Sequence, residues 1–304
     1  MSNENNEKIN KICEEYGTRI FENEPIKKHT TFGIGGNCKY FIDINSVDCL
    51  KKILDELKNS NSRYFIMGRG SNILASDNGY DGYIIHFGNS FSGIKKNDDG
   101  TIDALSGTPM NLLGKYAIEN SLSGFECLCG IPGTLGGAIY MNAGAYGEEI
   151  SDVVVSVTSI DNNGNEKIYK KEDMDFSYRH SIFNENSEII TSVNLQLKPA
   201  NKKEIEEYTS ELLERRREKQ PLEFKSAGST FKRPKGDYAS RLIEQCGLKG
   251  MSVGDAEVST KHSGFIINKG NASCSDVIEL CQKVQKIVME KTGYKLEIEP
   301  VILK

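Results

Sequence analysis

The chain has 304 residues, with 38 Lys and Arg against 43 Asp and Glu and a formal net charge of −5. This length allows two or three small domains, and the acidic balance argues against nucleic acid as the main partner. No apolar run approaches the length of a membrane span, and residues 1–11 lack the apolar core of a signal peptide. We therefore expect a cytoplasmic protein with no membrane or nucleic-acid partner, and we expect a monomer.

Cysteine and histidine spacing gives no sign of a metal or redox centre. The chain has eight cysteines, and without an export signal we expect them to be reduced, partly buried thiols. Cys127 and Cys129 have the wrong spacing for a zinc knuckle or a Cys-x-x-Cys redox pair. The histidines show no metal-ligand spacing either, and they are His29, His86, His180 and His262. We expect no metal.

The first half of the chain is predicted to alternate strands and helices. Residues 1–24 are expected to form a polar, helical N-terminal arm. Ser46 can cap a helix over 47–60, whose apolar residues fall on one face. A helix over 108–121 begins with Pro109 in its first turn. The predicted strands are 39–44, 63–67, 83–87 and 102–105.

The second half contains two further strands and then a mixed module. Strands are predicted over 153–160 and 189–197, with a boundary at 199–201. A charged helix over 202–219 is stopped by Pro221. The remaining segments are predicted as helix 237–246, strand 264–268, helix 275–291 and strand 296–303.

The first of two prominent glycine stretches is Gly68-Arg69-Gly70-Ser71-Asn72, which follows a predicted strand. Its backbone N–H groups, serine hydroxyl and asparagine amide suit an anion. It matches neither the dinucleotide-binding fingerprint nor a P-loop, and residues 73–79 are expected to form a loop instead of a helix. An ordinary β-turn is the alternative interpretation.

The second glycine stretch, residues 130–138, has four glycines and one proline among nine residues. Such small residues let a phosphate or a planar ring lie against the backbone, although a compact buried turn is the alternative. The two stretches are about 60 residues apart in the sequence. Together they suggest a pyrophosphate that is held from two sides.

Several weaker candidates have ordinary structural explanations. Residues 33–36 are expected to form a tight turn, and Arg179 alone would be a surface residue. The basic residues at 215–219 suit the C-terminal end of a helix or an anionic ligand. Ser229 lies among small residues without the Gly-x-Ser-x-Gly elbow of a hydrolase. Glu297 and Glu299 would share one face of the terminal strand.

Taken together, these segments resemble the UDP-N-acetylenolpyruvoylglucosamine reductase (MurB) family of flavoenzymes, which complete UDP-N-acetylmuramate for peptidoglycan. The resemblance covers His29–Lys304 and rests on HTTFGIGG, MGRGSNIL, GIPGTLGGAIYMNAGAYG, SYRHS, SAGSTFKRP, KHSGFIIN and LEIEPV. It implies an α+β fold with an FAD-binding region of the vanillyl-alcohol-oxidase/p-cresol-methylhydroxylase (PCMH) type at 25–200, in two subdomains split near 95–105. A substrate-binding α+β domain would follow at 201–304.

The resemblance also implies where FAD is bound. The pyrophosphate would lie on Gly68, Arg69, Gly70, Ser71 and Asn72. The isoalloxazine would lie near Gly130, Ile131, Pro132, Gly133, Thr134, Gly136, Gly137 and Ala138. Arg216 would lie in the cofactor cleft. Because residues 69–72 contain no histidine, unlike the covalent flavoenzymes of this fold, we expect non-covalent FAD.

The reaction implied by the resemblance begins when NADPH reduces FAD. Flavin N5 then delivers a hydride to C3 of the enolpyruvyl ether, and Ser229 protonates C2. Arg179 and Glu299 would stabilise the enolate-like intermediate, with Glu297 as the alternative carboxylate. The UDP-sugar would be bound by Lys219, Arg233 and His262.

Two features of this interpretation concern subtype and competing functions. The short segment 183–201 leaves no room for an inserted substrate loop, which resembles the shorter of the family's two subtypes. A non-redox protein that binds or transfers a nucleotide sugar, and a flavin oxidase on the same fold, are the competing hypotheses. Flavin bound to the purified protein would argue against the non-redox protein. Rapid reoxidation of the reduced flavin by oxygen would indicate the oxidase.

Overall fold

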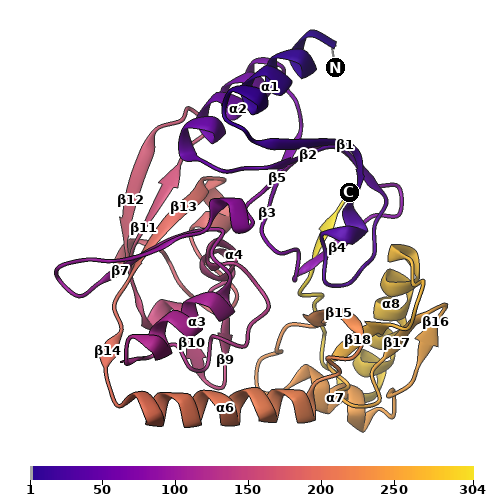
Figure 1. The fold of residues 1–304 in the computed structure, drawn as a ribbon. Helices are drawn as coiled ribbons and strands as arrows, with labels where there is room; N and C mark the ends of the chain where they lie inside the picture. Colours follow the sequence, from indigo (N-terminus) through magenta and orange to yellow (C-terminus); the bar gives the residue numbers. More distant parts are fainter. Residues whose placement is uncertain (1–2) are drawn as a thin grey trace. The chain divides into compact units, whose positions relative to one another are not determined.

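The computed structural model describes residues 3–304, which form two compact units (Figure 1). Unit 1 comprises the described residues up to Glu22, Tyr40–Arg69 and Gly82–Glu214. Unit 2 comprises Asn23–Lys39, Gly70–Asp81 and Arg215–Lys304. Unit 2 thus combines two segments from the first third of the chain with the C-terminal region. Within residues 3–304, no helix is long and apolar enough to cross a membrane.

A four-stranded sheet has the order β1-β2-β5-β3, in which β3 and β5 run parallel. Ser46 caps α2 as predicted, with its side chain accepting a hydrogen bond from the Cys49 N–H at 3.3 Å. In α1, Ile9 and Cys13 are buried in the same core cluster as Ile53 of α2. The N-terminal helix is therefore part of unit 1 and not a separate arm. The elements are α1 (Asn3–Glu15), β1 (Arg19–Pro25), β2 (Asn37–Asp43), α2 (Val47–Asn59), β3 (Tyr64–Met67) and β5 (Tyr80–His86).

A five-stranded antiparallel sheet in unit 1 has the order β12-β11-β13-β7-β6. Its strands are β6 (Ile94–Lys96), β7 (Ile102–Leu105), β11 (Val154–Ile160), β12 (Glu166–Lys170) and β13 (Ile189–Leu195). Helices α3 (Met110–Glu119) and α4 (Leu135–Tyr140) share its core cluster, in which Leu113 and Ile139 are fully buried with Val157 (Figure 1). This core positions the second glycine stretch, because that stretch continues into α4.

Unit 2 is built on an antiparallel sheet with the order β15-β18-β17-β16. Leu242 and Leu280, from the two helices of this unit, share a buried core with Val258 and Ile266 of the sheet. A parallel pair, β4 and β19, joins the segment after the first glycine stretch to the C-terminus. The elements are β4 (Ile73–Ala75), β15 (Lys225–Ser229), α7 (Ala239–Gln245), β16 (Ser252–Val253), β17 (Ala256–Val258), β18 (Phe265–Asn268), α8 (Cys274–Thr292) and β19 (Val301–Leu303).

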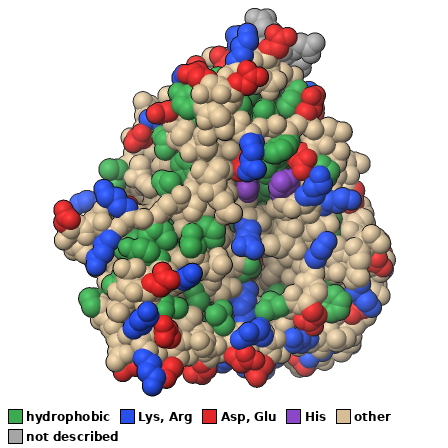
Figure 2. All heavy atoms as spheres, viewed as in Figure 1, with side chains coloured by type: hydrophobic (Ala, Val, Ile, Leu, Met, Phe, Trp, Pro, Cys, Tyr) green, Lys and Arg blue, Asp and Glu red, His purple; other side chains and the backbone are tan. Residues whose placement is uncertain are grey.

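The chain passes from unit 1 to unit 2 within the long helix α6 (Lys202–Lys219). On the face shown in Figure 2, acidic and basic side chains are mixed along the edge that this helix forms in Figure 1. The short elements are η1 (Ile26–Lys28), η2 (Asn89–Phe91), β8 (Leu122–Ser123), β9 (Gly144–Ala145), β10 (Glu148–Glu149), η3 (Ile150–Asp152), η4 (Lys171–Asp173), α5 (Phe183–Asn186) and β14 (Lys198–Pro199).

Most predicted helices and strands agree closely with the structure, but two predictions near the candidate site are wrong. Residues 73–79, expected to form a loop, begin with the strand β4. The strand expected over 296–303 is confined to β19, so Glu297 and Glu299 precede it and do not share a strand face. Helix α4 lies in a segment where no helix was predicted.

Candidate functional site

The first glycine stretch presents a run of backbone donors that have no internal partner. The N–H groups of Gly68, Arg69, Gly70 and Ser71 donate no hydrogen bond within the described range 3–304. Gly70 has a φ of 63°, in the left-handed region that glycine adopts readily. Successive unpaired N–H groups of this kind bind phosphate oxygens. The donor set therefore fits the pyrophosphate of FAD.

Protein atoms already occupy the space beside two glycines of this stretch. A Cβ on Gly68 would lie 2.2 Å from Oγ1 of Thr134, so the two glycine stretches are in contact within unit 1. A Cβ on Gly70 would lie 2.3 Å from the carbonyl oxygen of His29, and the Thr31 N–H donates to the Gly70 carbonyl at 3.3 Å. His29 and Thr31, at the start of the HTTFGIGG segment, thus support the first glycine stretch.

The second glycine stretch combines a packing role with one open position. A Cβ on Gly136 would lie 2.8 Å from that of Ser106, and the Gly136 N–H donates to the Ser106 carbonyl at 2.7 Å. Gly137 is exposed, and its Cβ would meet only Oγ1 of Thr134, at 3.7 Å. A flat ring can approach the backbone at Gly137, where no protein atom fills the space of a side chain.

Arg179 lies in a tight turn of unit 1 and has a φ of 58°. The flanking residues Ser177 and His180 exchange backbone hydrogen bonds of 3.2 and 3.1 Å. The Arg179 Nη2 atom donates to the carbonyl of Gly144 at 3.5 Å, and its Cζ atom lies 4.8 Å from the centre of the Tyr178 ring. These contacts hold the guanidinium beside the segment that follows α4.

Ser229 ends β15 at a bulge in unit 2. The register between β15 and β18 shifts between Ser226 and Ser229, and the intervening Gly228 has a φ of 75°. The Ser229 side chain is exposed, and its hydroxyl has no hydrogen bond within residues 3–304. The carbonyl of the next residue, Thr230, accepts a hydrogen bond from the Glu299 N–H at 2.9 Å. Two predicted catalytic residues therefore lie on adjacent segments.

Glu297 and Glu299 differ in their surroundings. Glu297 is exposed, and its carbonyl accepts a hydrogen bond from the Lys232 N–H at 2.8 Å. Glu299 is half-buried, and its carbonyl accepts a hydrogen bond from Nδ2 of Asn72 at 3.4 Å. This contact places the backbone of Glu299 against the first glycine stretch.

His262 and Lys219 lie on two segments of unit 2 that are joined by a hydrogen bond. The Lys261 Nζ atom donates to the carbonyl of Arg217 at 2.8 Å, which joins the turn before β18 to the end of α6. Nδ1 of His262 accepts a hydrogen bond from the Gly264 N–H at 3.1 Å, so Nε2 carries the proton of the neutral ring. Burial lowers the pKa of His262, and a backbone hydrogen bond opposes this only in part, so the neutral form prevails at pH 7.

The two remaining predicted arginines also lie in unit 2. The Cζ atom of the exposed Arg233 lies 4.5 Å from the centre of the Tyr238 ring, a contact that fixes the guanidinium plane. Tyr238 was missed by the sequence analysis, because a stacking partner five residues away in a loop gives no periodic signal. Arg216 is half-buried in α6, and its carbonyl accepts a hydrogen bond from the Gln220 N–H at 2.9 Å.

The candidate residues thus form two sets. Arg179 and the stretch 130–138 belong to unit 1, whereas Ser229, Glu299 and the basic residues belong to unit 2. The first glycine stretch contributes Gly68 and Arg69 to unit 1 and its remaining residues to unit 2.

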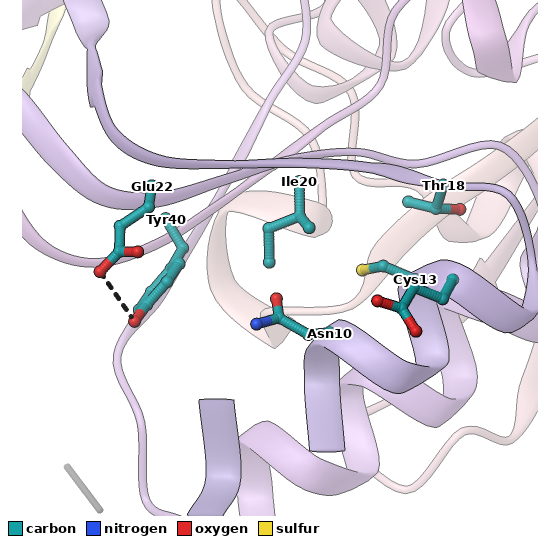
Figure 3. A pocket seen from close by; sticks show the side chains of 7 residues that line it. Asn10, Cys13, Thr18, Ile20, Glu22 and Tyr40 are labelled. Carbon is teal, nitrogen blue, oxygen red and sulfur yellow. Dashed lines mark hydrogen bonds between the residues drawn. The ribbon is translucent and has the colours of Figure 1, made fainter. Parts of the chain in front are cut away.

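A cavity of ≈ 320 Å³ lies beside α1 and contains none of the predicted site residues (Figure 3). It is lined by Asn10, Cys13, Glu14, Thr18, Ile20, Glu22 and Tyr40. The Tyr40 hydroxyl donates to Glu22 Oε1 at 3.5 Å. Two carboxylates and no cation would repel a diphosphate, so this cavity does not suit FAD or a UDP-sugar.

All eight cysteines are free and buried, in agreement with the predicted reduced thiols. Burial raises the pKa of Cys13 and of Cys281 to about 12. Both thiols therefore stay protonated at neutral pH and are poor nucleophiles.

Comparison with known proteins agrees with this arrangement. Residues 38–168 match the FAD binding domain, and residues 220–303 match the C-terminal domain of UDP-N-acetylenolpyruvoylglucosamine reductase. The reductase of Caldanaerobacter subterraneus is 45% identical over 95% of both chains, and that of Clostridioides difficile is 44% identical over 92% of both. The crystal structure of the Thermus caldophilus reductase is 33% identical, with a TM-score of 0.77 over 94% of this chain and 99% of that one.

An FAD-binding domain followed by the C-terminal domain of UDP-N-acetylenolpyruvoylglucosamine reductase defines a flavin-dependent oxidoreductase. The chain belongs to the UDP-N-acetylenolpyruvoylglucosamine reductase family. The reaction of this family is the NADPH-dependent, FAD-mediated reduction of a UDP-sugar enolpyruvyl ether to UDP-N-acetylmuramate in peptidoglycan precursor synthesis. The fold class, the cofactor and the reaction expected from the sequence are thereby confirmed.

Proposed function

We propose that this chain reduces UDP-N-acetyl-3-O-(1-carboxyvinyl)-glucosamine with Ser229 as the proton donor. In this proposal Arg179 and Glu299 stabilise the negative charge that develops on the substrate. When bound, FAD accepts a hydride from NADPH and supplies it to C3 of the enolpyruvyl group. The observation that carries the proposal is the exposed Ser229 hydroxyl, which has no hydrogen bond to the described part of the chain and lies one residue from the backbone hydrogen bond between Thr230 and Glu299.

Ser229 can act as an acid although its hydroxyl is a weak one. After hydride transfer, C2 of the substrate has carbanion character and is a much stronger base than a serine alkoxide. Proton transfer from Oγ to C2 therefore runs downhill. The bulge at Gly228 is consistent with this role, because it shifts the register of β15 just before Ser229, whose side chain is exposed.

Arg179 and Glu299 would act on the substrate carboxylate, where the enolate charge gathers. A guanidinium fixed by Gly144 and Tyr178 can stabilise that charge without reorganising. An ionised carboxylate would repel the same charge, so Glu299 can help only as a neutral acid that donates a hydrogen bond.

The cofactor and substrate contacts complete the proposal. The free N–H groups of residues 68–71 would hold the FAD pyrophosphate without a covalent link, and the open backbone at Gly137 would accept the flavin ring. Lys219, Arg233 and neutral His262 would bind the diphosphate and carboxylate of the substrate. We also propose that the protein is a monomer and acts in the cytoplasm, for which its eight free cysteines suit a reducing compartment.

The role of Ser229 is tested by separating the two half-reactions in a stopped-flow experiment. In Ser229→Ala, reduction of the flavin by NADPH should be unchanged, because no proton from Ser229 is needed. Reoxidation by the enolpyruvyl ether should slow by about 10² to 10⁴. Ser252→Ala, which changes an exposed serine in β16, is the matched control and should leave both rates unchanged. Equal loss of both half-reactions in Ser229→Ala would reject the assigned role.

A further inference from the structure

The loop that carries Arg179 also brings together three side chains able to bind a metal. One ligand atom each from Asp175, His180 and Glu185 lies within 4.8 Å of the other two. Nε2 of His180 lies 3.3 Å from Oδ2 of Asp175 and 3.7 Å from Oε1 of Glu185. All three residues belong to unit 1.

These separations are those of ion pairs, and ligands around one ion can lie at similar distances. His180 makes no side-chain hydrogen bond to either carboxylate or to any other residue in the described range 3–304. Atoms bound to one ion at about 2.1 Å lie about 3.0 Å apart in octahedral geometry and about 3.4 Å apart in tetrahedral geometry. An imidazole nitrogen that faces two carboxylate oxygens at these distances leaves room for an ion among them.

The backbone of this loop is held in place by its own hydrogen bonds. The Ile182 N–H donates to the Met174 carbonyl at 2.7 Å, which closes the loop at its base. The Ser181 hydroxyl donates to the carbonyl of Tyr140 at 2.9 Å, and its N–H donates to Oδ1 of Asn184 at 2.7 Å. Because none of these bonds uses the side chain of Asp175, His180 or Glu185, little ordering of the loop would be needed when an ion binds.

We propose that Asp175, His180 and Glu185 form a binding site for a first-row divalent metal ion such as Zn²⁺. One imidazole and two carboxylates suit Zn²⁺, Mn²⁺ or Co²⁺, whereas Mg²⁺ and Ca²⁺ prefer oxygen ligands alone. The charges of the two carboxylates balance that of the ion. The carboxylate side chains are 74% and 64% exposed, so water completes the coordination shell.

This site does not depend on the proposed catalytic roles, but it has a consequence for one of them. His180 follows Arg179 directly and takes part in the two backbone hydrogen bonds that form its turn. An ion on His180 therefore stiffens the turn that carries the guanidinium. Because the imidazole binds through Nε2, the backbone bonds between Ser177 and His180 remain intact.

The proposal is tested by titrating Zn²⁺ into the FAD-loaded protein in competition with a chromophoric chelator. We expect one tight equivalent per chain, and affinity about 10-fold to 100-fold weaker in His180→Gln and in Glu185→Gln. Asp173→Asn removes an exposed carboxylate two residues from Asp175 and should bind Zn²⁺ as the parent does. Equal Zn²⁺ affinity in the parent and His180→Gln would overturn the site.

Thermal unfolding supplies a second readout that includes a check on folding. Zn²⁺ should raise the Tm of the parent and of Asp173→Asn, because an ion that binds only the folded state stabilises it. In Glu185→Gln the Tm without metal should match that of the parent, and the Zn²⁺-dependent rise should be lost. A rise of equal size in Glu185→Gln, or no rise in the parent, would show that the three side chains form an ion-pair cluster only.

Discussion

At the scale of single residues, two backbone hydrogen bonds distinguish Glu299, the proposed catalytic carboxylate, from Glu297. The Glu299 N–H bonds to Thr230, whereas the carbonyl of Glu297 bonds to Lys232, two residues further from Ser229. The half-buried Glu299 therefore pairs with the residue next to Ser229, the proposed proton donor, whereas the exposed Glu297 pairs three residues away from it.

This difference predicts unequal effects of two conservative substitutions. Glu299→Gln keeps a hydrogen-bond donor but changes its strength, so reoxidation by the enolpyruvyl ether should slow by about tenfold to a hundredfold. Glu297→Gln is the matched control and should stay within about twofold of the parent. Single-turnover reoxidation with prereduced enzyme measures both. Slow turnover in Glu297→Gln together with a normal rate in Glu299→Gln would reverse the assignment.

A buried carboxylate in unit 1, that of Asp43, makes the stability of the fold depend on pH in the acidic range. Burial opposes ionisation of Asp43, but a hydrogen bond with His86 at 2.9 Å and further bonds from Ser90 and Arg19 outweigh it and lower the pKa to about 2. The unfolded carboxyl has its ordinary pKa of 3.8, so it takes up a proton before the folded one does as the pH falls. The stabilisation is complete above that value and is lost as the pH falls toward 2.

The expected contribution of Asp43 is roughly 2 kcal/mol at neutral pH. In Asp43→Asn, the free energy of unfolding should be lower at pH 7 and should fall less between pH 5 and pH 2 than in the parent. Urea unfolding at a series of pH values gives both curves. Asp98→Asn, which changes an exposed carboxylate, should follow the parent. Curves for the parent and Asp43→Asn that stay parallel down to pH 2 would contradict the shift.

At the scale of elements, the two glycine stretches use glycine for different reasons. At Gly68 the missing side chain makes room for Thr134, a contact within the protein. At Gly137, in the first turn of α4, the space is open. Substitution by alanine should therefore separate a packing requirement from a ligand requirement.

Gly137→Ala should stabilise the flavin-free protein by up to about 1 kcal/mol, because alanine favours a helix over glycine. It should at the same time weaken FAD binding, because the added methyl group would fill the space proposed for the ring. Gly68→Ala should instead destabilise the protein by about 1–3 kcal/mol through overpacking. Thermal unfolding and fluorescence titration of deflavinated protein with FAD measure these effects. Unchanged FAD affinity in Gly137→Ala would place the ring elsewhere.

Elements specified by local signals were predictable from the sequence, whereas those that depend on distant partners were not. Ser46 caps the start of α2, and Pro221 follows the end of α6; both signals act on neighbouring backbone. Helices α2 and α6 end within one residue of the predicted limits. Helix α4 contains two unfavourable glycines and forms because Leu135 and Ile139 are fully buried in the core. No local pattern specifies that packing.

The candidate site was predictable to a similar extent. The glycine stretches and Ser229 were found from residue type and from the family resemblance, and their contacts now support those assignments. The three metal-binding side chains were not found, because their spacing of five residues belongs to a loop that closes on itself and to no regular element. The distinction between Glu297 and Glu299 required the backbone pairing with residues 230–232.

At the scale of the whole molecule, the last strand of the chain supports a segment more than 200 residues earlier. β19 pairs in parallel with β4, directly after the first glycine stretch. The Val301 N–H donates to the Asn72 carbonyl at 2.9 Å, and the Leu303 carbonyl accepts a hydrogen bond from the Ser76 N–H at 2.8 Å. Leu303 is itself buried. The C-terminus therefore holds the downstream end of the proposed phosphate site.

Removal of residues 301–304 should consequently weaken FAD binding although none of these residues is proposed to touch the cofactor. The loss of the Leu303 side chain alone should cost about 1.5–3 kcal/mol of stability. The loss of the hydrogen bond from the Val301 N–H to the Asn72 carbonyl would add to the mobility of the glycine stretch. Deletion of Lys304 alone keeps the strand pairing and is the control, expected to retain the parent's FAD affinity. Since truncation can impair folding, Leu303→Ala provides a milder test. In this variant both the Tm and the FAD affinity should fall. A lower Tm with unchanged FAD affinity would show that the C-terminal strand does not support cofactor binding.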